Sequence, residues 1–163
     1  MFRIHLLCVV GVSLWSLAGD SHQASPPAVL SAALRDHLKT ERLEVVTSVR
    51  GLPLGVREAL QGLFGSASLD IAEPGAEFQA TDVIVNPKLP TRRLVAAGCS
   101  ADHCLVYYER GGIAHTWHVA LFHWTPGATS LAWGGAGRGG MRTIDAVRNA
   151  VLSGEIKGPP KSW

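Results

Sequence analysis

The sequence predicts an α+β domain, in which an antiparallel β-meander of about four to five strands carries two or three helices packed on one face. Three observations support this prediction. Four short runs rich in β-branched and aromatic residues follow one another between residues 93 and 133. The connections between them are of hairpin length, and Gly111-Gly112 in one of them permits the positive φ of a tight turn. Apolar residues at helical spacing lie before and after this segment.

The helices are expected on both sides of the meander along the chain. Two prolines favour a helix that starts at residues 26–27 and runs to about Leu38. A second helix is expected from Pro53 to Phe64, because Gly65 follows as a C-terminal stop. The last helix is expected over Ile144–Ser153, with a threonine before it as the N-cap.

The strands of the meander are expected where runs of β-favouring residues are separated by turn residues. They are Arg93–Cys99, Cys104–Glu109, His115–Trp124 and Thr129–Trp133. Weaker alternation also predicts strands at 43–49 and 78–85.

The first 27 residues are not expected to belong to the fold. Residues 1–18 contain Arg3, a short apolar run and then small residues at 16 and 18, which is the layout of a cleaved secretory signal peptide. The run is too short to span a bilayer readily, so an uncleaved membrane anchor is the less favoured alternative. Residues 19–27 are predicted to be a linker, 28–154 a single domain and 155–163 a C-terminal tail. The mature protein is therefore expected to be secreted or periplasmic, without a stable membrane anchor.

Export determines how the cysteines are interpreted. Loss of the signal peptide removes Cys8 and leaves Cys99 and Cys104, which flank four residues between two predicted strands. Neighbouring antiparallel strands place such cysteines opposite each other, and an oxidising compartment favours their disulfide. A redox-active pair or thiolate metal ligands are the alternatives, but C-x4-C is not a common zinc spacing.

Charge and motifs exclude several kinds of partner. The formal net charge of +2 comes without a basic run of five or more residues, so no nucleic-acid partner is expected. Gly135–Gly140 matches G-x-G-x-x-G, but the strands before it are predicted to be antiparallel and no parallel strand follows. We therefore expect no nucleotide and no other cofactor.

The segment HTWHVALFHW, residues 115–124, contains three histidines and two tryptophans. Centring the hairpin turn on Gly111-Gly112 places Tyr108 opposite His115 and makes His103 a diagonal neighbour of His118. Diagonal side chains are close enough for two imidazoles to share an ion, with Asp102 or Tyr107 as a third ligand. Catalytic zinc normally takes three protein ligands, so two ordinary strand histidines are the preferred interpretation and a His103–His118 metal site the alternative.

Two functions of different classes follow. The first is an exported, non-enzymatic binding or inhibitor-like protein, which presents aromatic and cationic side chains to an unknown protein, glycan or cell-wall component. The partner-binding residues proposed for it are Tyr107, Arg110, Phe122, Trp124 and Trp133. The second is a metal-dependent hydrolase or metal-binding protein that uses His103 and His118. Because no complete catalytic constellation is present in the sequence, the first hypothesis is preferred and no catalytic residue is proposed.

Overall fold

The computed structural model describes residues 27–84 and 86–163. The predicted signal peptide and all but the last residue of the predicted linker lie outside these ranges. Within the described ranges, no helix combines the length and the apolar character needed to cross a bilayer.

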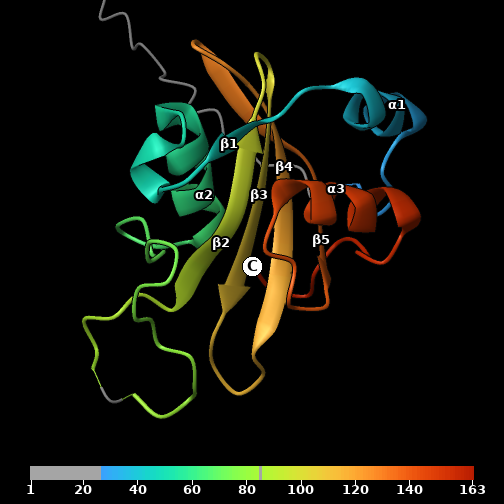
Figure 1. The fold of residues 1–163 in the computed structure, drawn as a ribbon. Helices are drawn as coiled ribbons and strands as arrows, with labels where there is room; N and C mark the ends of the chain where they lie inside the picture. The colour runs from blue at the N-terminus through green and yellow to red at the C-terminus, as the bar shows by residue number, and fades with distance from the viewer. Residues whose placement is uncertain (1–26, 85) are drawn as a thin grey trace, which may run out of the picture.

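A single antiparallel sheet forms the centre of the structure (Figure 1). Each of its five strands pairs with the next one along the chain, which confirms the predicted α+β meander. The strands are β1 (Glu44–Val46), β2 (Arg92–Cys99), β3 (His103–Arg110), β4 (Thr116–Thr125) and β5 (Ala128–Gly137). The predicted strand at 78–85 does not form in its described part, where only Thr81 makes an isolated bridge, to Gly112.

The three α-helices are α1 (Ala32–Thr40), α2 (Leu54–Phe64) and α3 (Ile144–Ser153), and a short 3-10 helix, η1 (Val49–Gly51), follows β1. Helix α1 begins later than expected because Ser31 is its N-cap and accepts a hydrogen bond from the backbone N–H of Leu34. Helices α2 and α3 both end at a glycine in the left-handed conformation, and Gly65 ends α2 as predicted.

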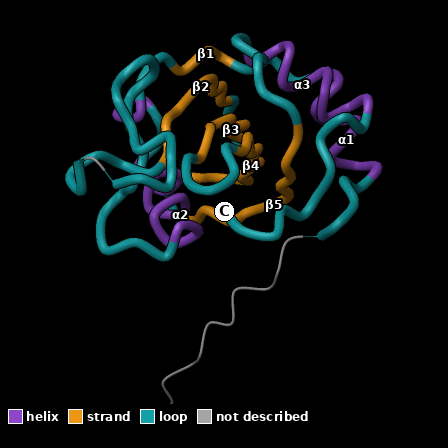
Figure 2. Tube along the Cα trace, turned by 90° about the horizontal axis from the view of Figure 1, so that it is seen from below, coloured by secondary structure: helices purple, strands orange, loops and turns teal. Residues whose placement is uncertain are grey.

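The helices lie on both faces of the sheet, whereas the sequence predicted them on one. Figure 2 shows α1 and α3 on one side of the strands and α2 on the other. The reason is the composition of β3, in which every residue except Arg110 is buried. A strand whose two faces are both apolar needs cover on each of them.

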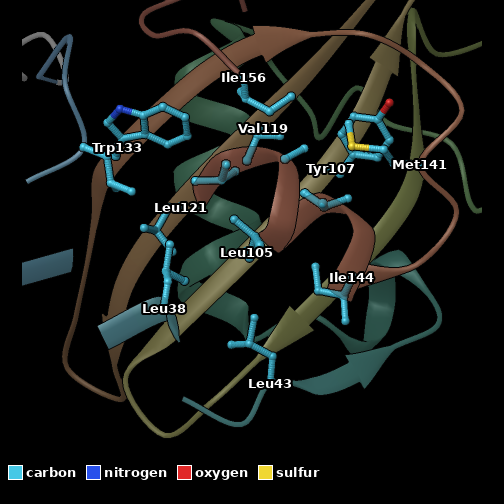
Figure 3. Close-up of a cluster of buried hydrophobic side chains, with 14 residues drawn as sticks. Leu38, Leu43, Leu105, Tyr107, Val119, Leu121, Trp133, Met141, Ile144 and Ile156 are labelled. Carbon is cyan, nitrogen blue, oxygen red and sulfur yellow. The ribbon is translucent and has the colours of Figure 1, made fainter. Parts of the chain in front are cut away.

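The first hydrophobic core lies between the sheet and the helices α1 and α3 (Figure 3). The strand residues in it point to one face, and they meet side chains from α1, α3 and the segment after α3. Its labelled members are Leu38, Leu43, Leu105, Tyr107, Val119, Leu121, Trp133, Met141, Ile144 and Ile156. This core fixes the position of α1 over the sheet.

The second core lies on the opposite face, under α2. Val56 and Leu60 of the helix are fully buried against the sheet. The strand residues that meet them alternate with those of the first core, as a pleated strand requires. They include Cys104, Val106, Tyr108, Ala120 and Phe122.

The C-terminal residues 155–163 pack against the sheet. Lys157 exchanges two backbone hydrogen bonds with Ala136 of β5, at 2.8 and 3.0 Å. Ile156 is buried in the first core, and the carbonyl oxygen of Trp163 accepts a hydrogen bond from Arg92 at 2.7 Å. These contacts hold the chain end beside β5 and the start of β2.

Candidate metal centre

The turn between β2 and β3 positions two potential metal ligands. Its base is closed by the Cys99–Cys104 disulfide, which joins residues directly opposite each other in the sheet, as predicted. Inside the turn, Ser100 Oγ accepts hydrogen bonds from the backbone N–H groups of Asp102 and His103, at 3.4 and 3.0 Å. Hydrogen bonds therefore fix the backbone that carries the side chains of Asp102 and His103.

Helix α1 brings a histidine and a glutamate to the same place. His37 lies in the last turn of the helix and Glu41 at its C-cap, and a spacing of four residues puts both side chains on one face. The helix is held by the fully buried Leu38 and by Arg35, whose Nη1 donates to the carbonyl oxygen of Leu152 in α3 at 2.6 Å. This docking directs His37 and Glu41 toward the β2–β3 turn.

The four side chains form a compact cluster, which we call the His–carboxylate cluster. One potential ligand atom from each of His37, Glu41, Asp102 and His103 lies within 4.8 Å of all the others. His37 Nε2 is 2.6 Å from Glu41 Oε2 and 3.6 Å from Asp102 Oδ1. His103 Nδ1 is 3.0 Å from Asp102 Oδ1 and 3.9 Å from Glu41 Oε2. Ligands about 2.0–2.2 Å from a tetrahedral ion are roughly 3.3–3.6 Å apart, so shifts below 1 Å would fit these atoms around one ion.

Two atoms of the cluster have unmet hydrogen-bonding capacity. His37 Nε2 and Glu41 Oε2 are buried and have no hydrogen-bond partner. They approach each other to 2.6 Å as an ion-pair contact, which is not aligned as a hydrogen bond. The Glu41 side chain is only 10% exposed, so water does not readily replace the missing partner. Buried polar atoms are nearly always paired, and an ion between such atoms is one of the few explanations for an exception.

The electrostatics of the cluster favour a cation. The hydrogen bond with His103 lowers the pKa of Asp102 to about 2, and this outweighs the opposing effect of burial. Asp102 is therefore a carboxylate at neutral pH. The side chains of Asp102 and His37 are 45% and 37% exposed, which leaves the cluster open to solvent on one side. A cation can enter from that side and meet ligands that are already held together.

The donor set indicates which cations fit. Two imidazole nitrogens and two carboxylate oxygens suit borderline divalent ions such as Zn²⁺. Calcium and magnesium prefer sites made entirely of oxygen. The disulfide occupies both cysteines near the cluster, so no thiolate is available to favour a softer ion.

The predicted His103–His118 pair does not form. In the structure His118 lies opposite Tyr108, and His103 lies opposite His123. The prediction placed Tyr108 opposite His115, so the β3–β4 register differs from it by three residues. An odd shift moves every side chain of a strand to the other face. His103 and His118 therefore lie on opposite faces, roughly 17 Å apart along the strands, and one ion cannot bind both.

The register differs because the β3–β4 turn is longer than expected. The last pair of the β3–β4 ladder is Arg110 with Thr116, so the turn consists of residues 111–115. Of the two side chains proposed as a third ligand, Asp102 does lie beside His103. Tyr107 does not lie beside His103. Its hydroxyl donates to the carbonyl oxygen of Arg138 at 2.9 Å, and burial raises its pKa to about 12.

Most of the predicted aromatic binding surface lies inside the protein. Tyr107 and Phe122 are fully buried and Trp133 is 2% exposed, so these three stabilise the cores and present nothing to a partner. Trp124 and Arg110 are half-buried. Tyr107, Phe122 and Trp133 therefore do not form the exposed aromatic patch that the binding hypothesis requires, because both faces of the meander are covered by helices.

Sequence reasoning missed His37 and Glu41. A histidine and a glutamate four residues apart on a predicted helix are a weak signal that was present in the sequence. Their value as ligands depends on α1 docking beside a turn more than 60 residues later, which local patterns do not reveal.

Two glycines of the G-x-G-x-x-G match, Gly135 and Gly137, belong to β5, where a Cβ would collide with Ile156.

Comparisons of the chain with protein-family models, with curated proteins and with solved structures give no match.

Proposed function

We propose that this protein is an exported, non-catalytic binding protein whose ligand is a divalent transition-metal ion, with Zn²⁺ as the best-suited ion. The observation that carries the proposal is the convergence of His37, Glu41, Asp102 and His103, with two buried atoms that lack hydrogen-bond partners. A cation among these atoms would satisfy both of them and neutralise two carboxylates.

The number of ligands favours binding over catalysis. Structural zinc sites are closed by four protein ligands, whereas catalytic sites use three and keep a position open for water. The His–carboxylate cluster offers four. The hydrolase alternative based on His103 and His118 loses its support, because those side chains lie on opposite faces of the sheet.

Export is supported by the disulfide and by the predicted signal peptide. Disulfides persist in oxidising compartments and are rare in reducing ones. Here the Cys99–Cys104 bond closes the turn that carries Asp102 and His103. The same bond that indicates a secreted or periplasmic location thus contributes to the geometry of the proposed site.

The test is a zinc titration of the purified, chelator-treated protein by isothermal calorimetry. We expect one equivalent of Zn²⁺ to bind. Glu41→Gln and His37→Asn, which alter side chains at the end of α1 and spare the sheet, should each weaken binding at least about 100-fold, because even outer-sphere changes at metal sites cost 10–100-fold.

His115→Asn is the matched control. His115 also pairs with a carboxylate, Glu109 Oε2 at 2.8 Å, but lies at the other end of the sheet. Its variant should bind zinc as the unaltered protein does. The proposal is wrong if the protein takes up no zinc, or if Glu41→Gln and His115→Asn change the affinity equally.

A further inference from the structure

A concave feature in the described part of the chain lies far from the metal cluster, at the β3–β4 turn. It is a cavity of about 590 Å³ between this turn, the start of β4 and the C-terminal residues 160–162. Sites for small molecules commonly measure 300–1,000 Å³. Figure 1 shows the C-terminus beside this lower part of the sheet.

The walls of the cavity are fixed by specific contacts. On one side, Arg110 Nη1 donates to Ser162 Oγ at 2.7 Å and so links the end of β3 to the C-terminal segment. On the other, the backbone N–H of Gly111 donates to the carbonyl oxygen of Thr91 at 2.9 Å. Gly111 also passes so close to Gln79 that a Cβ would collide with its backbone. These contacts hold the hollow open between packed elements.

The cavity carries a net positive charge. Arg110 and Lys161 line it, against one carboxylate, Asp82. Burial lowers the pKa of His118 to about 4, with smaller contributions from Arg110 and from Arg92, which lies outside the lining and is paired with Asp70. His118 is therefore neutral at pH 7 and adds no charge to the cavity.

A buried polar group at the cavity lacks a partner. His118 lines the cavity and is 2% exposed, and its Nδ1 atom has no hydrogen-bond partner. Its other nitrogen, Nε2, is hydrogen-bonded to Thr116 Oγ1 at 2.8 Å. The ring stacks on Tyr108 with centroids 5.3 Å apart, which holds it in place. The ring is therefore a fixed part of the cavity wall.

Much of the remaining lining is apolar, and Thr116 and Ser162 add two hydroxyl groups to it. The apolar part includes Ile113, which is 94% exposed, together with Ala114, Ala136 and Pro160. A fully hydrated inorganic anion would gain nothing from these walls, whereas an organic anion would bury its carbon skeleton against them.

We propose that this cavity binds a small organic carboxylate with an apolar body. Arg110 and Lys161 supply the charge that complements the carboxylate, and the apolar residues contact the body of the ligand. This site is separate from the proposed metal centre, at the opposite end of the sheet.

The test compares benzoate with benzamide, its neutral counterpart of the same shape, by NMR titration of the isotope-labelled protein. Benzoate should bind saturably, with shifts of the amide signals of Gly111 and Gly112, and at least about tenfold more tightly than benzamide. Arg110→Gln and Lys161→Gln should each weaken benzoate binding severalfold. Arg138→Gln is the matched control, because Arg138 is an exposed cation paired with Glu155 and does not line the cavity.

Three results would overturn the proposal. The first is no saturable shift at these amides, and the second is equal binding of benzoate and benzamide. The third is equal binding of benzoate and inorganic phosphate, which would leave the apolar walls without a role. Since none of these measurements involves zinc, the outcome is independent of the metal proposal.

Discussion

Replacing His118 with phenylalanine should flatten the acid dependence of the protein's stability. Burial lowers the pKa of His118 in the folded state to about 4, compared with about 6.5 in an unfolded chain. Between these values the unfolded state binds the proton and the folded state does not. The stabilisation from neutral His118 is therefore present above pH 6.5 and is lost as the pH falls toward 4.

The size of the effect follows from the difference between the two pKa values. Between pH 7.5 and pH 4.5, protonation of His118 in the unfolded chain removes about 2–3 kcal/mol from the free energy of unfolding. For a domain of this size that corresponds to a shift in Tm of roughly 10 °C. Phenylalanine keeps an aromatic ring against Tyr108 and cannot titrate, so the variant should lack this part of the acid loss.

The assay is urea unfolding, followed by circular dichroism at half-unit intervals from pH 7.5 to 4.5 with a chelator present. His123→Phe is the control, because His123 is an exposed residue of the same strand. The control should follow the unaltered protein, whereas the His118→Phe curve should be flatter by about 2–3 kcal/mol over the range. Parallel curves for His118→Phe and the unaltered protein would show that the burial of this imidazole has no energetic consequence.

Two further predictions concern the fold. The double substitution Cys99→Ala/Cys104→Ala should lower the free energy of unfolding by about 2 kcal/mol, because the disulfide closes a short loop; urea titration in the absence of reductant checks this, and an unchanged midpoint would contradict it. Leu60→Ala should cost about 2–5 kcal/mol, because Leu60 of α2 is fully buried in the second core. Ile113→Ala, at a 94% exposed position, should cost less than about 0.5 kcal/mol, and comparable losses for both would contradict the described second core.

The architecture was predictable where the signal is local. Hairpin-length connections with turn residues predicted the meander, and the cap residues Thr143 and Gly65 predicted where α3 begins and where α2 ends. The disulfide followed from the number of cysteines and the expected compartment. Each of these features depends on residues close together in the sequence.

The site was not predictable, because it depends on tertiary docking and on register. The β3–β4 turn is longer than its glycines suggested, and the resulting odd shift moved His118 to the face opposite His103. The burial of Tyr107 and Phe122 depends on helices covering both faces of the sheet. His37 and Glu41 meet Asp102 and His103 only because α1 packs beside a turn distant in sequence.

The most direct test of the metal proposal is a crystal structure of the zinc-loaded protein with anomalous diffraction recorded at the zinc edge. We expect one anomalous peak within about 2.0–2.2 Å of His37 Nε2, Glu41 Oε2, Asp102 Oδ1 and His103 Nδ1. A zinc peak elsewhere, or none in crystals grown with a stoichiometric amount of zinc, would contradict the assignment of this cluster as the metal centre.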